Sequence, residues 1–180
     1  MKRGHLAIGA SVAVAVVVAL LIVVLAVSPT ATDRITYSPL VGKPAPAIDA
    51  RTVQGRSFSL GDYRGEWVLV NFFGTWCVPC RQEHPQLRAF DEEHTKAGDG
   101  TVVSVIVNDT ASSVRSFFAQ LGGDWPVVLD PKTLIALSYG LVKVPESYLI
   151  DPNGLVEAKI SGEVTATGLD KIIAQLKAHQ

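Results

Sequence analysis

The sequence has few cysteines, little charge and almost no net charge. Its 180 residues include two cysteines and one methionine, 18% of them are charged, and the formal net charge is -1. So few cysteines cannot form the several bridges of a small disulfide-rich secreted domain, nor complete a four-sulfur zinc site. The near-zero net charge provides no general attraction to phosphate, so no nucleic-acid partner is expected. The two cysteines must therefore be interpreted as a pair.

One long apolar run is present near the N-terminus. Residues 6–27 contain no charged residue, and a helix of this length spans about 33 Å, enough for a hydrocarbon core of about 30 Å. We predict an uncleaved transmembrane signal-anchor. Cleavage and secretion are the alternative, because residues 26–28 resemble a small-residue cleavage site. Lys2 and Arg3 precede the run, which predicts that residues 1–5 are cytoplasmic and that the remainder of the chain faces outward.

The chain beyond the apolar run divides into a tether and a folded domain. Residues 28–41 are rich in Ser, Thr and Pro, which is typical of a linker, and residues 42–180 have the length of a single domain. We therefore expect a single-pass protein of the cell membrane, attached through its N-terminal helix, whose domain lies on the periplasmic or outer face.

Apolar patterns predict alternating strands and helices in this domain. The continuous apolar runs 67–73 and 101–107 are typical of strands buried on both faces, and the polar stretch between them predicts a helix. Such a strand-helix-strand unit makes the two strands parallel. Residues 47–51 and 57–60 predict an N-terminal hairpin.

The C-terminal part predicts further elements and their starting points. The first of the remaining elements is expected to be a helix that is capped by Asp109 or Thr110 and ends before Gly122. It is expected to be followed by strand 126–129, helix 132–138, strand 147–150, strand 155–160 and a final helix. The short helix is expected to be capped by Asp130, with Pro131 at its first position. The final helix is expected to begin at a capping box of Thr167 and Asp170.

The two cysteines, Cys77 and Cys80, stand three residues apart between the first buried strand and the helix after it. The unpaired N–H groups of a first helical turn favour a thiolate on the first cysteine, and Pro79 suits a first turn because it lacks an N–H. We therefore predict a redox-active disulfide, with Cys77 as the exposed nucleophile and Cys80 as the resolving thiol.

Other interpretations of the cysteine pair fit the sequence less well. A zinc half-site would need His84 or His94, which on a polar helix are expected to be solvated, so no metal site is predicted. Covalent haem attachment requires a histidine where Arg81 stands. A purely structural disulfide is disfavoured, because so short a loop removes little chain entropy. No bound cofactor is expected.

Three segments, in order, resemble one known family: VGKPAPAIDA, GEWVLVNFFGTWCVPCRQEHPQL and YGLVKVPESYLIDPNGLV. They resemble the membrane-anchored thioredoxin-like thiol-disulfide oxidoreductases of cytochrome c maturation, the TlpA/ResA/DsbE (CcmG) proteins. The resemblance implies an α/β thioredoxin fold, a central mixed sheet flanked by helices. It further implies an N-terminal β-hairpin extension and a central insertion, here residues 110–140, in a domain preceded by one transmembrane helix.

The resemblance also implies roles for individual residues. It implies a cis peptide between Val144 and Pro145 beside the disulfide, whereas the residues alone favour a strand-edge proline. It also makes Glu83 the acid that handles protons near the thiols. A solvated helix carboxylate is the alternative for Glu83. Thioredoxins carry a buried acid six residues before the first cysteine, where this chain has Asn71, and that difference increases the expected importance of Glu83.

Substrate contacts are expected from Trp76, Val144 and Glu146. Trp76 would provide an apolar platform beside the first cysteine, with core packing as its alternative. Glu146 matches the Pro-Glu pair of the same family branch, and a solvated loop position is its alternative.

The expected activity is thiol-disulfide exchange, in which the first cysteine attacks a substrate disulfide and the second resolves the mixed disulfide. The resemblance implies apocytochrome c as the protein substrate and a transmembrane thiol as the electron donor; we expect a monomer. Two alternatives remain open: an oxidant that forms disulfides in secreted proteins, and a copper carrier for respiratory-complex assembly. A peroxiredoxin is disfavoured, because Val70 and Gly74 stand where P-x-x-x-T-x-x-C requires Pro and Thr.

Overall fold

The computed structural model describes residues 14–20 and 35–178. The chain forms two units, Met1–Thr30 and Ala31–Gln180. In the first, residues 14–20 are helical and exposed. The predicted cytoplasmic end and most of the predicted anchor and tether lie outside the described residues. Within the parts that are described, no helix combines the length and apolarity needed to cross a membrane.

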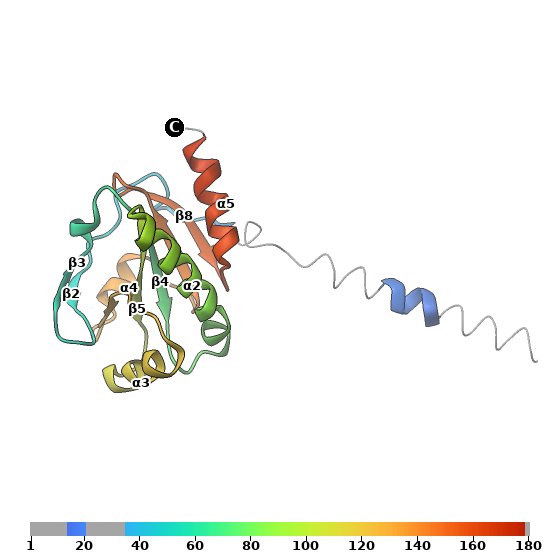
Figure 1. The fold of residues 1–180 in the computed structure, drawn as a ribbon, viewed down its shortest axis with the longest axis horizontal. Coiled ribbons are helices and arrows are strands. Elements are labelled where there is room, and N and C mark those ends of the chain that lie inside the picture. Colours follow the sequence, from blue (N-terminus) through green and yellow to red (C-terminus); the bar gives the residue numbers. More distant parts are fainter. Residues whose placement is uncertain (1–13, 21–34, 179–180) are drawn as a thin grey trace, which may run out of the picture. The chain divides into compact units, whose positions relative to one another are not determined.

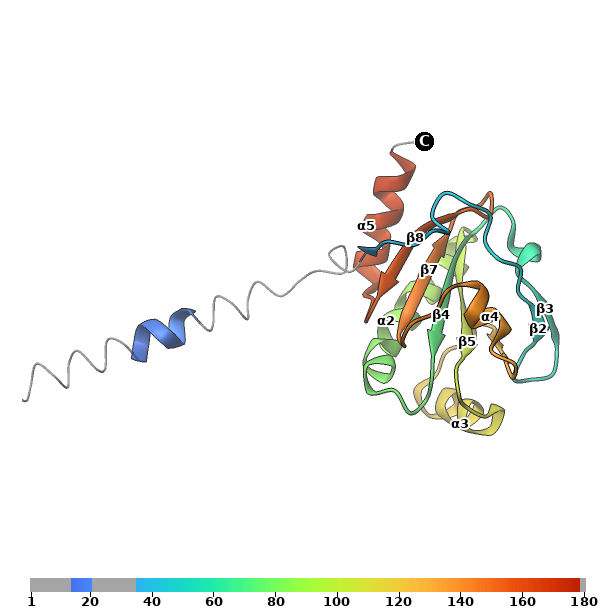
Figure 2. The ribbon, with the colours of Figure 1, turned by 180° about the vertical axis from the view of Figure 1, so that it is seen from behind.

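Residues 35–178 form a mixed six-stranded sheet with helices on both faces, and a separate two-stranded hairpin (Figure 1). The elements in chain order are β1 (Ile35–Thr36), β2 (Asp49–Arg51), β3 (Ser57–Ser59), the 3-10 helix η2 (Leu60–Tyr63), β4 (Trp67–Phe73), α2 (Val78–Ala97), β5 (Gly100–Ile106), α3 (Ala111–Leu121), β6 (Val127–Val128), α4 (Leu134–Ser138), β7 (Glu146–Ile150), β8 (Val156–Ser161) and α5 (Ala166–Lys177). The order across the sheet is β1-β8-β7-β4-β5-β6, as Figure 2 shows for its central strands.

The centre of the sheet is the pair β4 and β5. Every residue of both strands is buried, and the strands run parallel, from Trp67 opposite Gly100 to Phe73 opposite Ile106. A strand covered on both faces can be apolar throughout, which is why the continuous run predicted β4 with the observed bounds. α2 makes the crossover between the two strands, as predicted.

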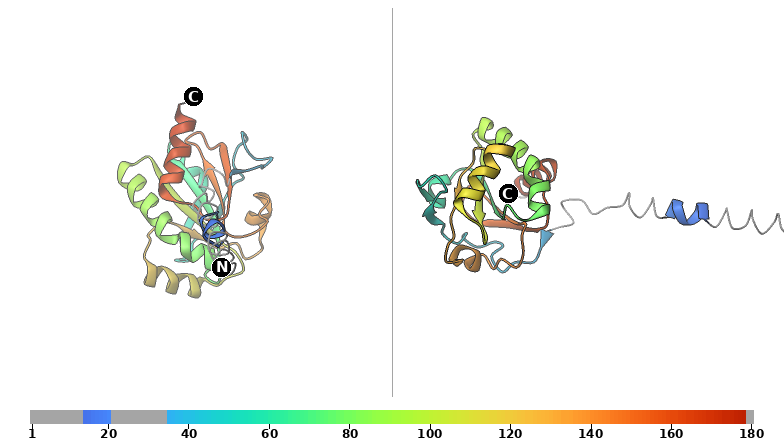
Figure 3. Two further views of the ribbon diagram at one scale, coloured as in Figure 1. Left: turned by 90° about the vertical axis from the view of Figure 1, so that its right-hand side faces the viewer. Right: turned by 90° about the horizontal axis from the view of Figure 1, so that it is seen from below.

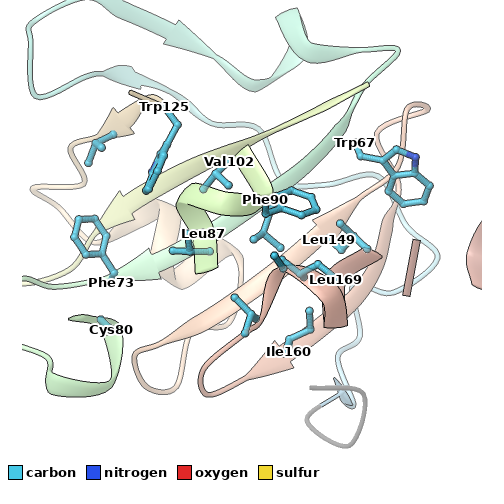
Figure 4. Packing of buried hydrophobic residues seen from close by; sticks show 14 of the residues in the cluster. Trp67, Phe73, Cys80, Leu87, Phe90, Val102, Trp125, Leu149, Ile160 and Leu169 are labelled. Atoms are coloured by element: carbon cyan, nitrogen blue, oxygen red, sulfur yellow. The ribbon is translucent and has the colours of Figure 1, made fainter. Parts of the chain in front are cut away.

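Two buried clusters cover the two faces of the sheet. Along β4, Leu69 and Phe73 face the cluster beneath α2, α3 and α5, whereas Val68, Val70 and Phe72 face the cluster beneath α4. This alternation follows from the two-residue period of a strand. Figure 3 shows α2 and α3 on the opposite side of the sheet from α4, and Figure 4 shows the side chains of the first cluster.

Both predicted hairpins are present. β2 and β3 pair antiparallel, with Asp49 opposite Ser59, and a bridge between Thr52 and Val128 attaches this hairpin to the main sheet. β7 and β8 also pair antiparallel, and in the turn between them the Asp151 carboxylate accepts from the N–H of Leu155 at 2.7 Å. The observed architecture is therefore the predicted mixed sheet with an N-terminal hairpin extension.

The predicted start of the short helix is wrong. α4 begins after Thr133, its N-cap, whose φ is 59°, and not after Asp130. A turn in which the Asp130 carbonyl accepts from Thr133 N intervenes. The Asp130 carboxylate then accepts from the N–H of Ala136, inside the first turn, at 2.9 Å.

The predicted capping box of the final helix is also wrong. The N-cap of α5 is Thr165, whose Oγ1 accepts from the N–H of Gly168 at 3.2 Å. Thr167 therefore lies inside the helix. Asp170 is directed away from the helix start, and its Oδ1 lies 3.1 Å from Nε2 of His94 on α2.

Candidate active site

The cysteine pair lies at the N-terminus of α2 and forms a disulfide. The Cα atoms of Cys77 and Cys80 are 5.3 Å apart. Cys77 is the N-cap residue, and its Sγ accepts from the N–H of Cys80 at 3.2 Å. A first-turn N–H at this sulfur favours negative charge on it, which is the property required of an attacking thiolate.

Both cysteines are buried in this disulfide form. Cys77 is only 5% exposed, so the prediction of an exposed nucleophile is wrong here, because its sulfur turns inward toward Cys80 and packs at the edge of the core. Figure 4 shows Cys80 at the edge of that cluster, near Phe73.

Trp76 covers the loop that leads to the disulfide, and its outer face is open to solvent. The side chain is 57% exposed, which excludes the core-packing alternative. Its Nε1 donates to the carbonyls of Val107 and Asn108 at 3.3 and 3.2 Å. A Cβ at Gly74 would lie 2.5 Å from that Nε1, so only glycine at this position lets the indole adopt its place next to Cys77.

The same loop is tied to the end of β5 by Asp109, a residue that sequence reasoning considered only as a helix cap. Its Oδ2 accepts from N and Oγ1 of Thr75 at 2.7 and 2.6 Å, and its Oδ1 accepts from the N–H of Thr110 at 2.7 Å. Partial burial acts to raise the pKa of Asp109, but these hydrogen bonds outweigh it and hold that pKa below its ordinary value. The ionised carboxylate thus fixes the loop before the cysteines.

Glu83 lies on α2, one turn beyond Cys80, and is 1% exposed. Its Oε1 accepts from Nδ2 of Asn71 at 3.0 Å, and its Oε2 accepts from the N–H of Val164 at 3.1 Å. The solvated alternative is therefore wrong. Side chains three residues apart on a helix are neighbours, so the carboxyl group of Glu83 and the sulfur of Cys80 share one face of α2.

Asn71 holds this buried carboxyl in place. Its Nδ2 also donates to Oγ of Ser147 at 3.0 Å, the residue opposite it on β7. Its Oδ1 is buried and has no hydrogen-bond partner among the described residues. The position that carries an acid in thioredoxins is thus occupied by an amide that binds an acid from a different element. Ser147 was missed, although its register opposite Asn71 follows once β4 and β7 are paired.

The peptide between Val144 and Pro145 is cis, as the resemblance implied. β4 and β7 pair with Phe72 opposite Glu146, so Pro145 lies level with the last residue of β4, where the loop to the cysteines begins. Val144 packs against the cluster that contains both cysteines. The Pro145 carbonyl accepts from the N–H of Gly162 at 2.9 Å.

Glu146 is buried in β7, so its solvated alternative is wrong. Its Oε2 lies 3.1 Å from Nζ of Lys159 and accepts from the N–H of Val142 at 3.2 Å, and its Oε1 accepts from Oγ of Ser161 at 3.4 Å. Burial acts to lower the pKa of Lys159, but Tyr148 and Glu146 outweigh it and raise that pKa. Lys159 therefore keeps its charge at neutral pH and forms a salt bridge with Glu146.

The two histidines of α2 are not solvated, contrary to expectation. His84 is buried, and its Nε2 donates to the Gly122 carbonyl at 2.9 Å; burial lowers its pKa. His94 lies between Asp99 and Asp170, with N–O distances of 2.7 and 3.1 Å. In the ranges 14–20 and 35–178, no three His, Cys, Asp or Glu side chains are grouped to hold a metal ion.

The fold and the site together define a class of protein. A mixed sheet carries a Cys-x-x-Cys disulfide at the start of the helix that follows its central strand, and a cis-proline loop lies at the same edge. This is the arrangement of a thioredoxin-like thiol-disulfide oxidoreductase.

Comparison with known proteins gives the family. Residues 41–159 match the model of the AhpC/TSA family, and the chain belongs to this family, as a ResA/DsbE-like thiol-disulfide oxidoreductase. It is 31% identical over 136 residues to the "Thiol-disulfide oxidoreductase ResA" of Bacillus thuringiensis subsp. konkukian, covering 76% of this chain and 78% of the relative. It is 33% identical to the ResA of Geobacillus thermodenitrificans, with the same coverage.

Solved structures confirm the thioredoxin-like fold. A thiol:disulfide interchange protein of the thioredoxin family from Chlorobium tepidum is 30% identical with a TM-score of 0.68, over 78% of this chain and 98% of that one. A DsbF homologue from Corynebacterium diphtheriae is 30% identical with a TM-score of 0.68, over 77% and 90% of the two chains. The predicted family and enzyme class are thus confirmed.

Proposed function

We propose that this oxidoreductase is an extracytoplasmic reductant of cytochrome c biogenesis, which reduces the Cys-x-x-Cys-His pair of apocytochrome c before haem attachment. The observation that carries the exchange chemistry is the Cys77–Cys80 disulfide at the N-terminus of α2. The resemblance to the cytochrome c maturation branch, together with relatives named ResA, supports the substrate.

The reaction is a two-step disulfide exchange. The Cys77 thiolate attacks one sulfur of the substrate disulfide, and the other substrate sulfur leaves as a thiolate and takes up a proton. The Cys80 thiolate then attacks Cys77, which forms the intramolecular disulfide and releases the second substrate thiol. The substrate disulfide gains two electrons and the enzyme dithiol loses them, so no bound cofactor is required.

Glu83 and Pro145 complete the catalytic group. Glu83 takes the proton from Cys80 as that thiol becomes the attacking thiolate, and returns it when the pair is reduced again. Its place next to Cys80 on α2, held by Asn71 and Val164, supports this role. Pro145, which lies level with the last residue of β4, rests against the substrate during exchange.

The substrate peptide lies between two apolar surfaces on either side of the disulfide. Trp76 provides one, through its exposed indole face, and Val144 provides the other, from the cis-proline loop. Glu146 supports that loop from inside, because its carboxylate accepts a hydrogen bond from the N–H of Val142. In this arrangement the sulfur of Cys77 is the atom that attacks the substrate disulfide.

The proposed location is the outer face of the cell membrane. The apolar run 6–27 would anchor the chain. Because residues 35–36 already pair with β8 in the folded domain, only residues 28–34 of the predicted tether would link the domain to the anchor and keep it within reach of a transmembrane thiol that returns electrons to the cysteine pair. The enzyme is expected to act as a monomer. The copper-carrier alternative finds no ligand set among residues 14–20 and 35–178, where both α2 histidines already have hydrogen-bond partners.

The direction of electron flow is tested by mixing the reduced full chain, without oxygen, with an oxidised synthetic Cys-x-x-Cys-His peptide. The reductant proposal predicts that the peptide becomes reduced while the Cys77–Cys80 pair becomes oxidised, and that Cys77→Ser abolishes the transfer. Oxidation of a reduced peptide by the disulfide form, without the forward reaction, would identify an oxidant and overturn the proposal.

A further inference from the structure

A buried cation lies behind the loop that carries the cis-proline. The side chain of Lys159, on β8, is 9% exposed. Its Nζ lies 3.1 Å from Oε2 of Glu146 and donates to the carbonyl of Gly140 at 3.4 Å. Gly140 and Glu146 are the two ends of the loop 140–146, so one ammonium group contacts both ends of the segment that carries Pro145.

The same loop is fixed to the end of β8 through the carboxylate of Glu146. That carboxylate accepts from the N–H of Val142 at 3.2 Å and from Oγ of Ser161 at 3.4 Å. The N–H of Gly162 donates to the Pro145 carbonyl at 2.9 Å. The side chain of Val142 is exposed, whereas its backbone N–H is held from inside by the carboxylate.

The charge of Lys159 is what allows Glu146 to remain in this position. A carboxylate buried with only neutral donors is costly, and removing one partner of a buried ion pair leaves an uncompensated charge. Without the ammonium group, the Glu146 carboxylate would have to bind water that enters the site or turn outward to solvent. Either change releases the N–H of Val142. The Tyr148 ring, 5.5 Å from Nζ, lies against the same cation.

We propose that Lys159 is a positioning residue for disulfide exchange. By neutralising Glu146 and joining the two ends of the loop 140–146, it holds Val144 and Pro145 where a peptide substrate meets the Cys77–Cys80 pair. This inference rests on the proposed function. Lys159 touches neither sulfur, so its effect falls on substrate binding rather than on the bond exchange itself.

The test is steady-state reduction of an oxidised Cys-x-x-Cys-His peptide by the full chain, with dithiothreitol as the recycling reductant. Lys159→Met is expected to raise KM for the peptide about tenfold, the equivalent of one charge-assisted hydrogen bond, and to change kcat by less than about twofold. Lys159→Arg, which keeps the charge, is expected to recover most of the wild-type KM. Ile172→Ala, a buried change in α5, is the control that loses stability without touching the loop.

The outcomes separate this inference from the proposed function. If wild-type protein does not reduce the peptide, the proposed function fails. If wild-type protein reduces it but Lys159→Met has the wild-type KM, the positioning role is wrong. An equal rise in KM for Ile172→Ala would also overturn it, because the effect would then follow stability alone. Should Lys159→Met not fold, Lys159→Gln replaces it, with the same expected rise in KM and the same outcomes.

Discussion

The substitution Glu83→Gln separates the proton chemistry of the buried carboxyl from its contribution to the fold. The new amide keeps an oxygen for the N–H of Val164, but its NH₂ group then faces Nδ2 of Asn71. Rotating the Asn71 amide by half a turn resolves the conflict, because its Oδ1, which has no partner among the described residues, then accepts from the new amide and from Ser147. We expect the free energy of unfolding to fall by about 1 kcal/mol or less, the net worth of one hydrogen bond.

Disulfide exchange is expected to suffer far more than stability. An amide neither takes up nor returns a proton, and positioned general acid–base catalysis is typically worth about 10²–10⁴-fold. The assay is peptide-disulfide reduction at pH 7, with urea unfolding of the same samples. Glu92→Gln, on the same helix in an exposed pair with Arg88, is the matched control and is expected to change the rate by less than about twofold.

The reasoning about Glu83 is refuted by either of two results. One is a wild-type exchange rate in Glu83→Gln. The other is a rate that declines only in proportion to the loss of folded protein, which would make the carboxyl structural and leave the proton transfer to another group.

Two further predictions concern the surroundings of the site. Because burial lowers the pKa of His84 in the folded chain, the unfolded chain binds more protons below about pH 6.5, so the stability that His84 contributes is present above that pH and is lost as the pH falls. His84→Gln keeps a donor for the Gly122 carbonyl, so between pH 7 and pH 5 this variant should lose less unfolding free energy than wild type in urea. His94 titrates in both proteins alike, so it does not affect the comparison. An identical loss of unfolding free energy in the two proteins would contradict the prediction. Gly74→Ala forces the indole of Trp76 from its place, so KM for the peptide should rise about threefold or more, whereas an unchanged KM would show that the indole does not bind substrate.

The sequence predicts best those elements whose signal is local and continuous. The run 67–73 matched β4 in both bounds because it is almost entirely apolar, and the hairpins matched because the Gly55 and Gly154 turns separate their strands. Helix starts were less predictable. Thr165 and Thr167 offer the same side-chain cap to the backbone, and the choice between them depends on where the preceding loop leaves β8.

The residues of the site also differ in how well the sequence predicts them. The Cys77–Cys80 pair follows from spacing alone. The burial of Glu83 on α2 depends on donors from Asn71 on β4 and from Val164 in the loop before α5, which meet only in the folded chain. Lys159 stands in a strand of mixed character, where the sequence gives no sign of its role. In the structure its Nζ contacts Gly140 and Glu146, the two ends of the loop 140–146. Pattern along one strand carries no information about a loop that folds over it from elsewhere in the chain.

The most direct test of the account is a redox titration of the full chain in thiol–disulfide buffers, with the Cys77–Cys80 disulfide counted by alkylation and mass spectrometry. The account predicts a reversible two-electron transition with a midpoint below about -220 mV, on the reducing side of disulfide catalysts. A midpoint near about -120 mV would contradict the reducing direction. A pair that stays in one state across all buffers would contradict disulfide exchange itself.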